Sequence, residues 1–80
     1  MSWKTIREMV RSGAYAGVDR GKDVKKFLEH HGFAVIPGRG KGSHWWLAKV
    51  VDDRPVGVSV PKGSIGIGLL KQILKQARII

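Results

Sequence analysis

The chain has 80 residues, a formal net charge of +9 and no cysteine. This length allows one small domain, and the lack of cysteine excludes both a disulfide framework and a zinc site built on Cys ligands. No apolar run approaches the roughly 20 residues that span a bilayer, and no signal-peptide stretch follows the N-terminus, so we expect the cytoplasm. A globular chain this basic is expected to attract polyanions, of which nucleic acid is the usual one.

The first half of the chain predicts two helices joined by a connector. Residues 2–11 carry apolar side chains at helical spacing on one face and charges on the other. Residues 12–21 are rich in Gly and Ala and predict a connector, in which Asp19 is a candidate cap for the next helix. That helix is expected over residues 22–31, where apolar side chains recur at i, i+3, i+4 and i+7. Gly32 then suits the left-handed position that ends a helix.

The second half predicts three strands and a closing helix. Residues 33–36 are a short apolar strand, residues 44–51 are rich in Trp and Val, and residues 56–60 alternate Val with Gly or Ser. An apolar stripe resumes as a helix from about Gly68. Short connections favour an antiparallel meander, and the helical stripes need one face of that sheet. The expected fold class is therefore α+β, with helices on one face of a three-stranded antiparallel sheet and the other face open.

The alternation of side chains along the second strand assigns residues to the two faces of the sheet. We assign Trp45 and Leu47 to the core, which requires Lys49 on the same face to extend to an edge of the sheet. His44 and Trp46 are then expected on the open face, beside the Gly-rich turn. A register slip of one residue would invert this assignment.

The turn at residues 38–43 reads GRGKGS, which invites comparison with a phosphate-binding loop. That motif needs Gly-Lys followed directly by Ser or Thr and then by a helix, whereas here Gly42 intervenes and a strand follows. A flexible hairpin turn is the better interpretation. Its amides, together with Arg39 and Lys41, remain suited to contact a nucleic-acid backbone.

The three histidines differ in what their positions imply. His30 and His31 are adjacent on a helix and point in different directions, with no acid at ligand spacing, so we predict no metal site and expect His30 to be solvated and His31 partly buried. His44 follows a basic turn, and an imidazole there can move the protons that RNA cleavage requires. An isolated exposed histidine is nevertheless usually a plain surface residue. Trp46 has two interpretations, a strand aromatic packed on a neighbour or a platform for a stacked base.

Residues 21–80 resemble the HicA toxin family, the small mRNA interferases of toxin–antitoxin pairs. Four short motifs occur in the family's order: KDVKKFLEHH before Gly32, the turn that ends in Gly-Ser-His at His44, VSVP at the end of the third strand, and GLLKQILKQA in the last helix. The resemblance implies a fold like that of double-stranded-RNA-binding domains (dsRBD-like), α-β-β-β-α. Residues 1–20 are then an extra N-terminal helix and connector, and residues 21–80 form the HicA-like domain. Where relatives often carry a capping Thr this chain has Leu69, which leaves that task to Ser64 or a water.

The same resemblance implies metal-independent cleavage of mRNA with no cofactor, with His44 as the catalytic residue. The expected RNA-binding residues lie in the turn and on the open face: Arg39, Lys41, Gly42, Ser43 and Trp46. It also implies a HicB-type antitoxin that covers the active face. The expected assembly is either a homodimer of this chain or a heterotetramer with the antitoxin. Two alternatives stay open, a non-catalytic RNA-binding module of the same fold and a protein-interaction domain whose weak RNA affinity depends little on salt.

Overall fold

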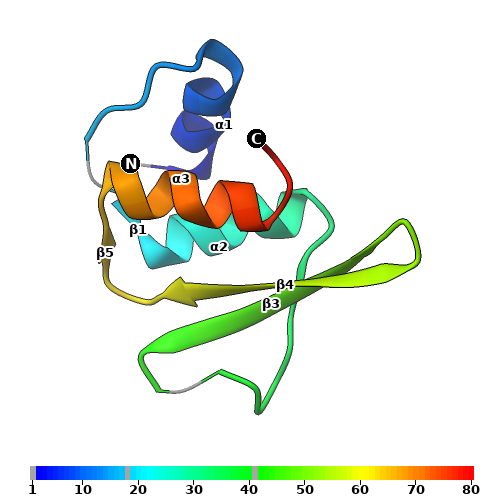
Figure 1. The fold of residues 1–80 in the computed structure, drawn as a ribbon. Coiled ribbons are helices and arrows are strands. Elements are labelled where there is room, and N and C mark those ends of the chain that lie inside the picture. Colours follow the sequence, from blue (N-terminus) through cyan, green and yellow to red (C-terminus); the bar gives the residue numbers. More distant parts are fainter. Residues whose placement is uncertain (1, 18, 41) are drawn as a thin grey trace.

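The structure, a computed structural model, describes residues 2–17, 19–40 and 42–80 (Figure 1). Its elements in chain order are α1 (Trp3–Ser12), β1 (Asp19–Arg20), α2 (Gly21–His30), β2 (Ala34–Val35), β3 (His44–Val51), β4 (Arg54–Pro61), β5 (Ser64–Ile65) and α3 (Ile67–Gln76). The expected α+β fold is confirmed, and the short strands β1 and β5 are additions to it. Among the described residues, no helix combines the length and the apolar character needed to cross a membrane.

The strands β2, β3 and β4 form the expected antiparallel meander, with β3 in the middle. The β3–β4 hairpin closes with Val51 opposite Arg54, so only Asp52 and Asp53 remain in the turn. Both have positive φ, 51° and 62°, which is the geometry of a type I′ turn that matches the strand twist. Because this turn is so tight, β4 begins two residues before the predicted strand. Pro55 is tolerated there because β4 lies at the sheet edge.

A second, two-stranded sheet links the connector after α1 to the loop before α3. Asp19 pairs with Ile65 and Arg20 with Ser64. The Gly21 N–H continues the pairing by donating to the Gly63 carbonyl over 2.8 Å. Neither segment was predicted as a strand, because strands of two residues are too short to show a period of two.

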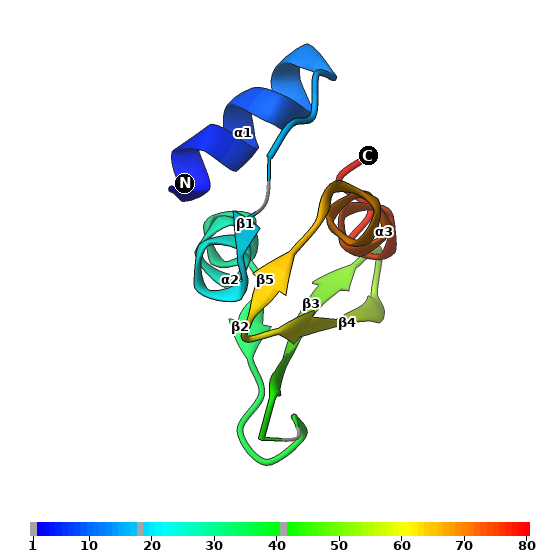
Figure 2. The same ribbon diagram turned by 90° about the vertical axis from the view of Figure 1, so that its left-hand side faces the viewer.

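The helices α2 and α3 cover one face of the three-stranded sheet, and α1 packs on the outer side of α2 (Figure 2). The predicted inward direction of the β4 valines is correct, since Val56, Val58 and Val60 are all buried. Leu47 is fully buried as expected, but Trp45 is only half-buried at the margin of the core. No helix formed by the described residues covers the opposite face of the sheet (Figure 2).

The end of α2 follows the prediction. Gly32 has φ of +87°, and the next N–H, from Phe33, donates to the Leu28 carbonyl over 3.0 Å. This is the pattern of a Schellman motif, with Gly in the left-handed position and a buried apolar residue after it.

Although Lys49 lies on the core face of the sheet, its side chain extends to the end of α2 and binds there. Its Nζ donates to the His31 carbonyl over 2.6 Å, which places a cation at a helix C-terminus, where the helix dipole favours it. Burial lowers the pKa of His31 below its ordinary value, and the positive charge of Lys49 lowers it further. The His31 residue as a whole is exposed, more than predicted, although its ring packs on Phe27. His30 is exposed as predicted, and its ring stacks on Trp3.

The two predicted helix caps do not form. The residue before α2 is Arg20, not Asp19, and no side chain caps that helix. Asp19 is instead buried, with 1% of its surface exposed, and its Oδ1 accepts no hydrogen bond from the described residues. Burial therefore raises the pKa of Asp19. Ser64 lies in β5, and α3 begins after Gly66 with no side-chain cap.

Candidate functional site

The open face of the sheet carries the Trp46 indole. Trp46 lies opposite Ser59 on β4, and its ring reaches diagonally over Gly57, where an added Cβ would overlap the ring. The Arg39 guanidinium lies 5.4 Å from the centroid of this ring, within cation–π range. A shallow hollow of about 410 Å³ opens here, lined among others by Arg39, Trp46 and Pro55. Trp46 is half-buried, so part of it remains accessible beside the Arg39 cation.

His44 is exposed at the first position of β3, opposite Pro61. Its Nδ1 lies 2.9 Å from the Ser43 hydroxyl, and either atom donates according to the tautomer of the ring. Within the described part of the chain, Nε2 makes no hydrogen bond. The Ser43 contact therefore orients the imidazole and leaves one ring nitrogen for another partner.

Two hollows of about 220 Å³ each flank the His44 ring. The first lies between the ring and the Gly-rich turn and includes Lys62. The second lies between the ring and α3 and includes Ser59, Gln72 and Gln76. The imidazole is thus accessible from two sides, as the prediction of an uncovered histidine requires.

The turn folds back onto the start of β3, and its conformation explains two of its three glycines. The Ile36 N–H donates to the Trp46 carbonyl over 2.8 Å. A Cβ at Gly40 would lie 2.5 Å from the His44 carbonyl oxygen, so the backbone can approach this closely only without a side chain. Gly38 has φ of +78°, a conformation that glycine adopts without strain. The turn is therefore a packed wall of the site.

The predicted RNA-binding residues do not all gather at His44. Ser43 contacts the His44 ring, and Gly42 lines the hollow beside it. Arg39 lies over Trp46 instead, so it belongs to the open face of the sheet. Lys41 lies outside the described residues.

Three residues around His44 were not predicted from the sequence. Lys62 reaches the site because its N–H donates to the Ser43 carbonyl over 2.9 Å, which ties the end of β4 to the start of β3. Gln72 and Gln76 are one turn apart on α3, and that i, i+4 spacing off the apolar stripe was the available signal. For Lys62 there was no local signal, since only the register of the hairpin brings it near His44.

The chemistry available here combines a proton acceptor with donors for an anion. In general, an imidazole can exchange protons, a lysine ammonium can attract an anion, and glutamine amides can donate hydrogen bonds. Neither hollow is lined by an acidic side chain among the residues described. The described residues also contain no group of three or more His, Asp or Glu side chains placed to hold a metal ion.

A helix-backed sheet with one open, basic face and an exposed histidine defines a small α+β domain of the dsRBD-like class. The family model described as "HicA toxin of bacterial toxin-antitoxin" matches residues 21–79. The chain therefore belongs to the HicA toxin family, so it is a toxin of a toxin–antitoxin system and has an antitoxin as its partner. No significant match was found among curated proteins or among solved structures.

Proposed function

We propose that this toxin is an endoribonuclease that cleaves mRNA and that His44 is its general acid or base. The observation that carries the proposal is the exposed His44 ring, oriented by Ser43 and open to hollows on two sides. A strongly basic chain adds long-range attraction for a polyanionic substrate.

The supported reaction is attack by the ribose 2′-OH on the neighbouring phosphorus. His44 accepts the 2′-OH proton while the new O2′–P bond forms and the P–O5′ bond breaks. The products are a 2′,3′-cyclic phosphate and a 5′-OH, with the leaving oxygen taking a proton from water or from the imidazolium. Lys62, which lines the first hollow, would stabilise the added negative charge of the transition state. The amides of Gln72 and Gln76, which line the second hollow, would donate to phosphoryl oxygens.

The remaining expected RNA contacts extend this proposal over the open face. Trp46 supplies a stacking surface, and Arg39 beside it supplies a cation for phosphate. Gly42 and Ser43 offer backbone and hydroxyl groups next to His44. Lys41, from the same basic turn, is included in the proposed contact set on its sequence position alone.

The proposal extends to organisation and partner. Residues 21–80 form the RNA-cleaving domain, and residues 1–20 are an accessory helix and connector. A HicB-type antitoxin covers the face that carries His44 and Trp46. The toxin is a homodimer or forms a heterotetramer with the antitoxin, and it acts in the cytoplasm. Complementary charge across that interface suits a surface this basic.

The test is cleavage of unstructured RNA by purified toxin in buffer with EDTA. Wild-type protein and His31→Gln, which alters an exposed histidine on the far end of α2, should cleave, while His44→Ala should lose activity by at least ~100-fold. Product ends analysed by mass spectrometry should carry a 2′,3′-cyclic phosphate or its hydrolysis product. Equal cleavage by His44→Ala and wild type would refute the role of His44, and loss of all cleavage in EDTA would refute metal independence.

One observation favours the alternative of a non-catalytic RNA-binding module. Most nuclease sites of this chemistry use two proton-transfer groups, and the described linings of both hollows contain no second histidine and no carboxylate. Under this alternative, wild-type protein and His44→Ala bind RNA with similar affinity and neither cleaves it.

A further inference from the structure

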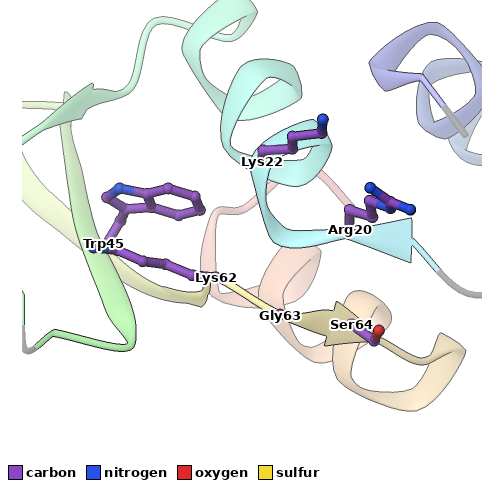
Figure 3. A pocket seen from close by; sticks show the side chains of 6 residues that line it. All are labelled: Arg20, Lys22, Trp45, Lys62, Gly63 and Ser64. Carbon is purple, nitrogen blue, oxygen red and sulfur yellow. The ribbon is translucent and has the colours of Figure 1, made fainter.

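A second basic pocket lies beside the His44 site and is larger than either hollow there. It has a volume of about 560 Å³ and is lined by Arg20, Lys22, Trp45, Lys62, Gly63 and Ser64 (Figure 3). Three of these six described lining residues are cationic and none is acidic. Such a concentration of positive charge favours an anionic ligand.

The pocket is assembled by the β1–β5 pairing. Arg20 lies opposite Ser64 in that pair, and Lys22 follows in the first turn of α2. An added Cβ at Gly21, between them, would overlap the Pro61 carbonyl oxygen, so the chain at the start of α2 lies directly against the end of β4. The side chains of Arg20 and Lys22 are therefore presented from a backbone that is anchored on both sides.

Trp45 forms the aromatic wall of the pocket. The ammonium groups of Lys62 and Lys25 lie 5.3 and 5.5 Å from its ring centroid, within the range of cation–π attraction. Figure 3 shows the indole extending from β3 toward the side of the pocket where Lys22 lies. An aromatic wall beside cations suits a ligand with both a flat ring and a phosphate.

The pocket adjoins the proposed active site. Trp45 and Lys62 line both this pocket and the hollow between His44 and the Gly-rich turn. By way of this shared lining, an RNA strand held at His44 would reach Arg20 and Lys22 past Lys62. An acidic peptide of a protein partner would bind the cations but would gain less from contact with the aromatic wall.

We propose that this pocket is an RNA subsite that holds a nucleotide next to the one at His44, with its phosphate at Arg20 and Lys22 and its base or sugar against Trp45. The volume falls in the range of pockets that enclose one small ligand. The inference rests on the proposed ribonuclease function of the His44 site, because that function supplies the strand that the subsite continues.

The test compares two double variants that remove the same charge. Arg20→Gln/Lys22→Gln alters the pocket, whereas Lys26→Gln/Lys75→Gln alters two exposed lysines that line none of the pockets described here. Both are made in the His44→Ala background so that the probe stays intact. Binding of a short unstructured fluorescein-labelled oligoribonucleotide is followed by fluorescence anisotropy over a series of KCl concentrations, and circular dichroism verifies that each variant is folded.

The pocket variant should bind RNA about tenfold more weakly than its parent. The magnitude of its slope of log affinity against log salt should fall by about 0.7, because the subsite holds one phosphate of a single strand. The control should keep most of the affinity and slope. In the active background, the pocket variant should raise KM with little change in kcat, because it removes binding made equally in ground and transition states.

Each contrary outcome has a distinct meaning. Equal losses in the two double variants would overturn the subsite, as would unchanged RNA binding in a pocket variant that no longer binds the antitoxin. If the pocket variant binds RNA more weakly than its control but wild-type protein never cleaves RNA, the subsite stands and the proposed catalysis fails. If wild-type protein cleaves RNA and the pocket variant matches its control, catalysis stands and the subsite fails.

Discussion

The indole of Trp46 lies directly over Gly57 on the neighbouring strand, in space that any side chain at position 57 would occupy. The two residues sit on the open face of the sheet, diagonal to one another in the β3–β4 register. The missing side chain at one position thus allows the aromatic ring at the other to lie flat against the sheet and to present its outer surface to a ligand.

Gly57→Ala should therefore impair RNA binding more than folding. The new methyl group displaces the Trp46 ring, which is free to swing outward, so the free energy of unfolding should change by less than about 1 kcal/mol. RNA affinity should fall by an amount approaching the loss of one stacked base, about 1–3 kcal/mol. Chemical denaturation and anisotropy titrations measure the two quantities.

The matched control for Gly57→Ala is Gly68→Ala, because an added Cβ at Gly68 on α3 meets no atom within 4 Å. It should leave RNA binding unchanged and stabilise the helix by roughly 0.5–1 kcal/mol. Unchanged RNA affinity in Gly57→Ala would remove Trp46 from the proposed binding surface.

Trp46→Ala and Arg39→Gln should weaken RNA binding in different ways. Loss of the indole removes stacking, so affinity falls at every salt concentration with an unchanged salt slope. Loss of the guanidinium removes one phosphate contact, so the slope of log affinity against log salt should fall by about 0.7. Anisotropy titrations across a KCl series separate the two effects. Identical slopes in Arg39→Gln and wild type would show that Arg39 serves only to pack on Trp46.

The buried Asp19 should make the protein less stable as pH rises. Burial raises its folded-state pKa above the ordinary value of 3.8, so the folded state binds the proton more tightly than the unfolded state does. This contribution to stability is complete below pH 3.8 and is lost as pH rises through the folded-state pKa. Asp19→Asn should therefore stabilise the protein at neutral pH, by about 1 kcal/mol or more.

Urea denaturation of wild type and Asp19→Asn at a series of pH values measures this effect. The difference in unfolding free energy between them should grow from acidic to neutral pH, and taking the difference cancels the contribution of His31. A constant difference across that range would mean that the Asp19 carboxylate is compensated in the folded protein.

Replacement of Arg78 by glycine should make the protein more stable. It has φ of +60° and occupies the left-handed position after α3, where its N–H donates to the Lys75 carbonyl and the next N–H, from Ile79, donates to the Leu74 carbonyl. A side chain in this conformation costs about 1 kcal/mol. Arg78→Gly should therefore raise the free energy of unfolding by roughly 0.5–1 kcal/mol, measured by chemical denaturation.

Arg78→Ala is the control for this change, because it removes the same charge and keeps the Cβ. It should be no more stable than wild type. Equal stability of the Gly and Ala variants would show that the gain comes from charge and not from the backbone.

Some features of the fold could be predicted from local sequence patterns alone. The Val56, Val58 and Val60 alternation predicted the buried face of β4, and Gly32 marked the left-handed end of α2. These features depend on neighbours within a few residues, and the physics of pleating and of helix ends acts over that range. The Asp19 cap failed because pairing with β5 drew that residue into the interior.

The residues of the candidate site likewise fall into two groups, those predicted from the sequence and those found only in the structure. His44 and Trp46 could be singled out because residue type, strand alternation and the preceding basic turn are all local. Lys62 and the α3 glutamines join them only through the hairpin register and the packing of α3.

By itself, the sequence determined the strong positive charge, the order of the three helices and of the strands of the three-stranded sheet, and the histidine at the head of β3, since composition and short periodic patterns express these directly. Only the tertiary structure decided that Arg20 and Lys22 share a pocket with Trp45 and Lys62. Residues so far apart in the chain meet through strand pairing and helix packing, and such long-range contacts have no counterpart in any local pattern.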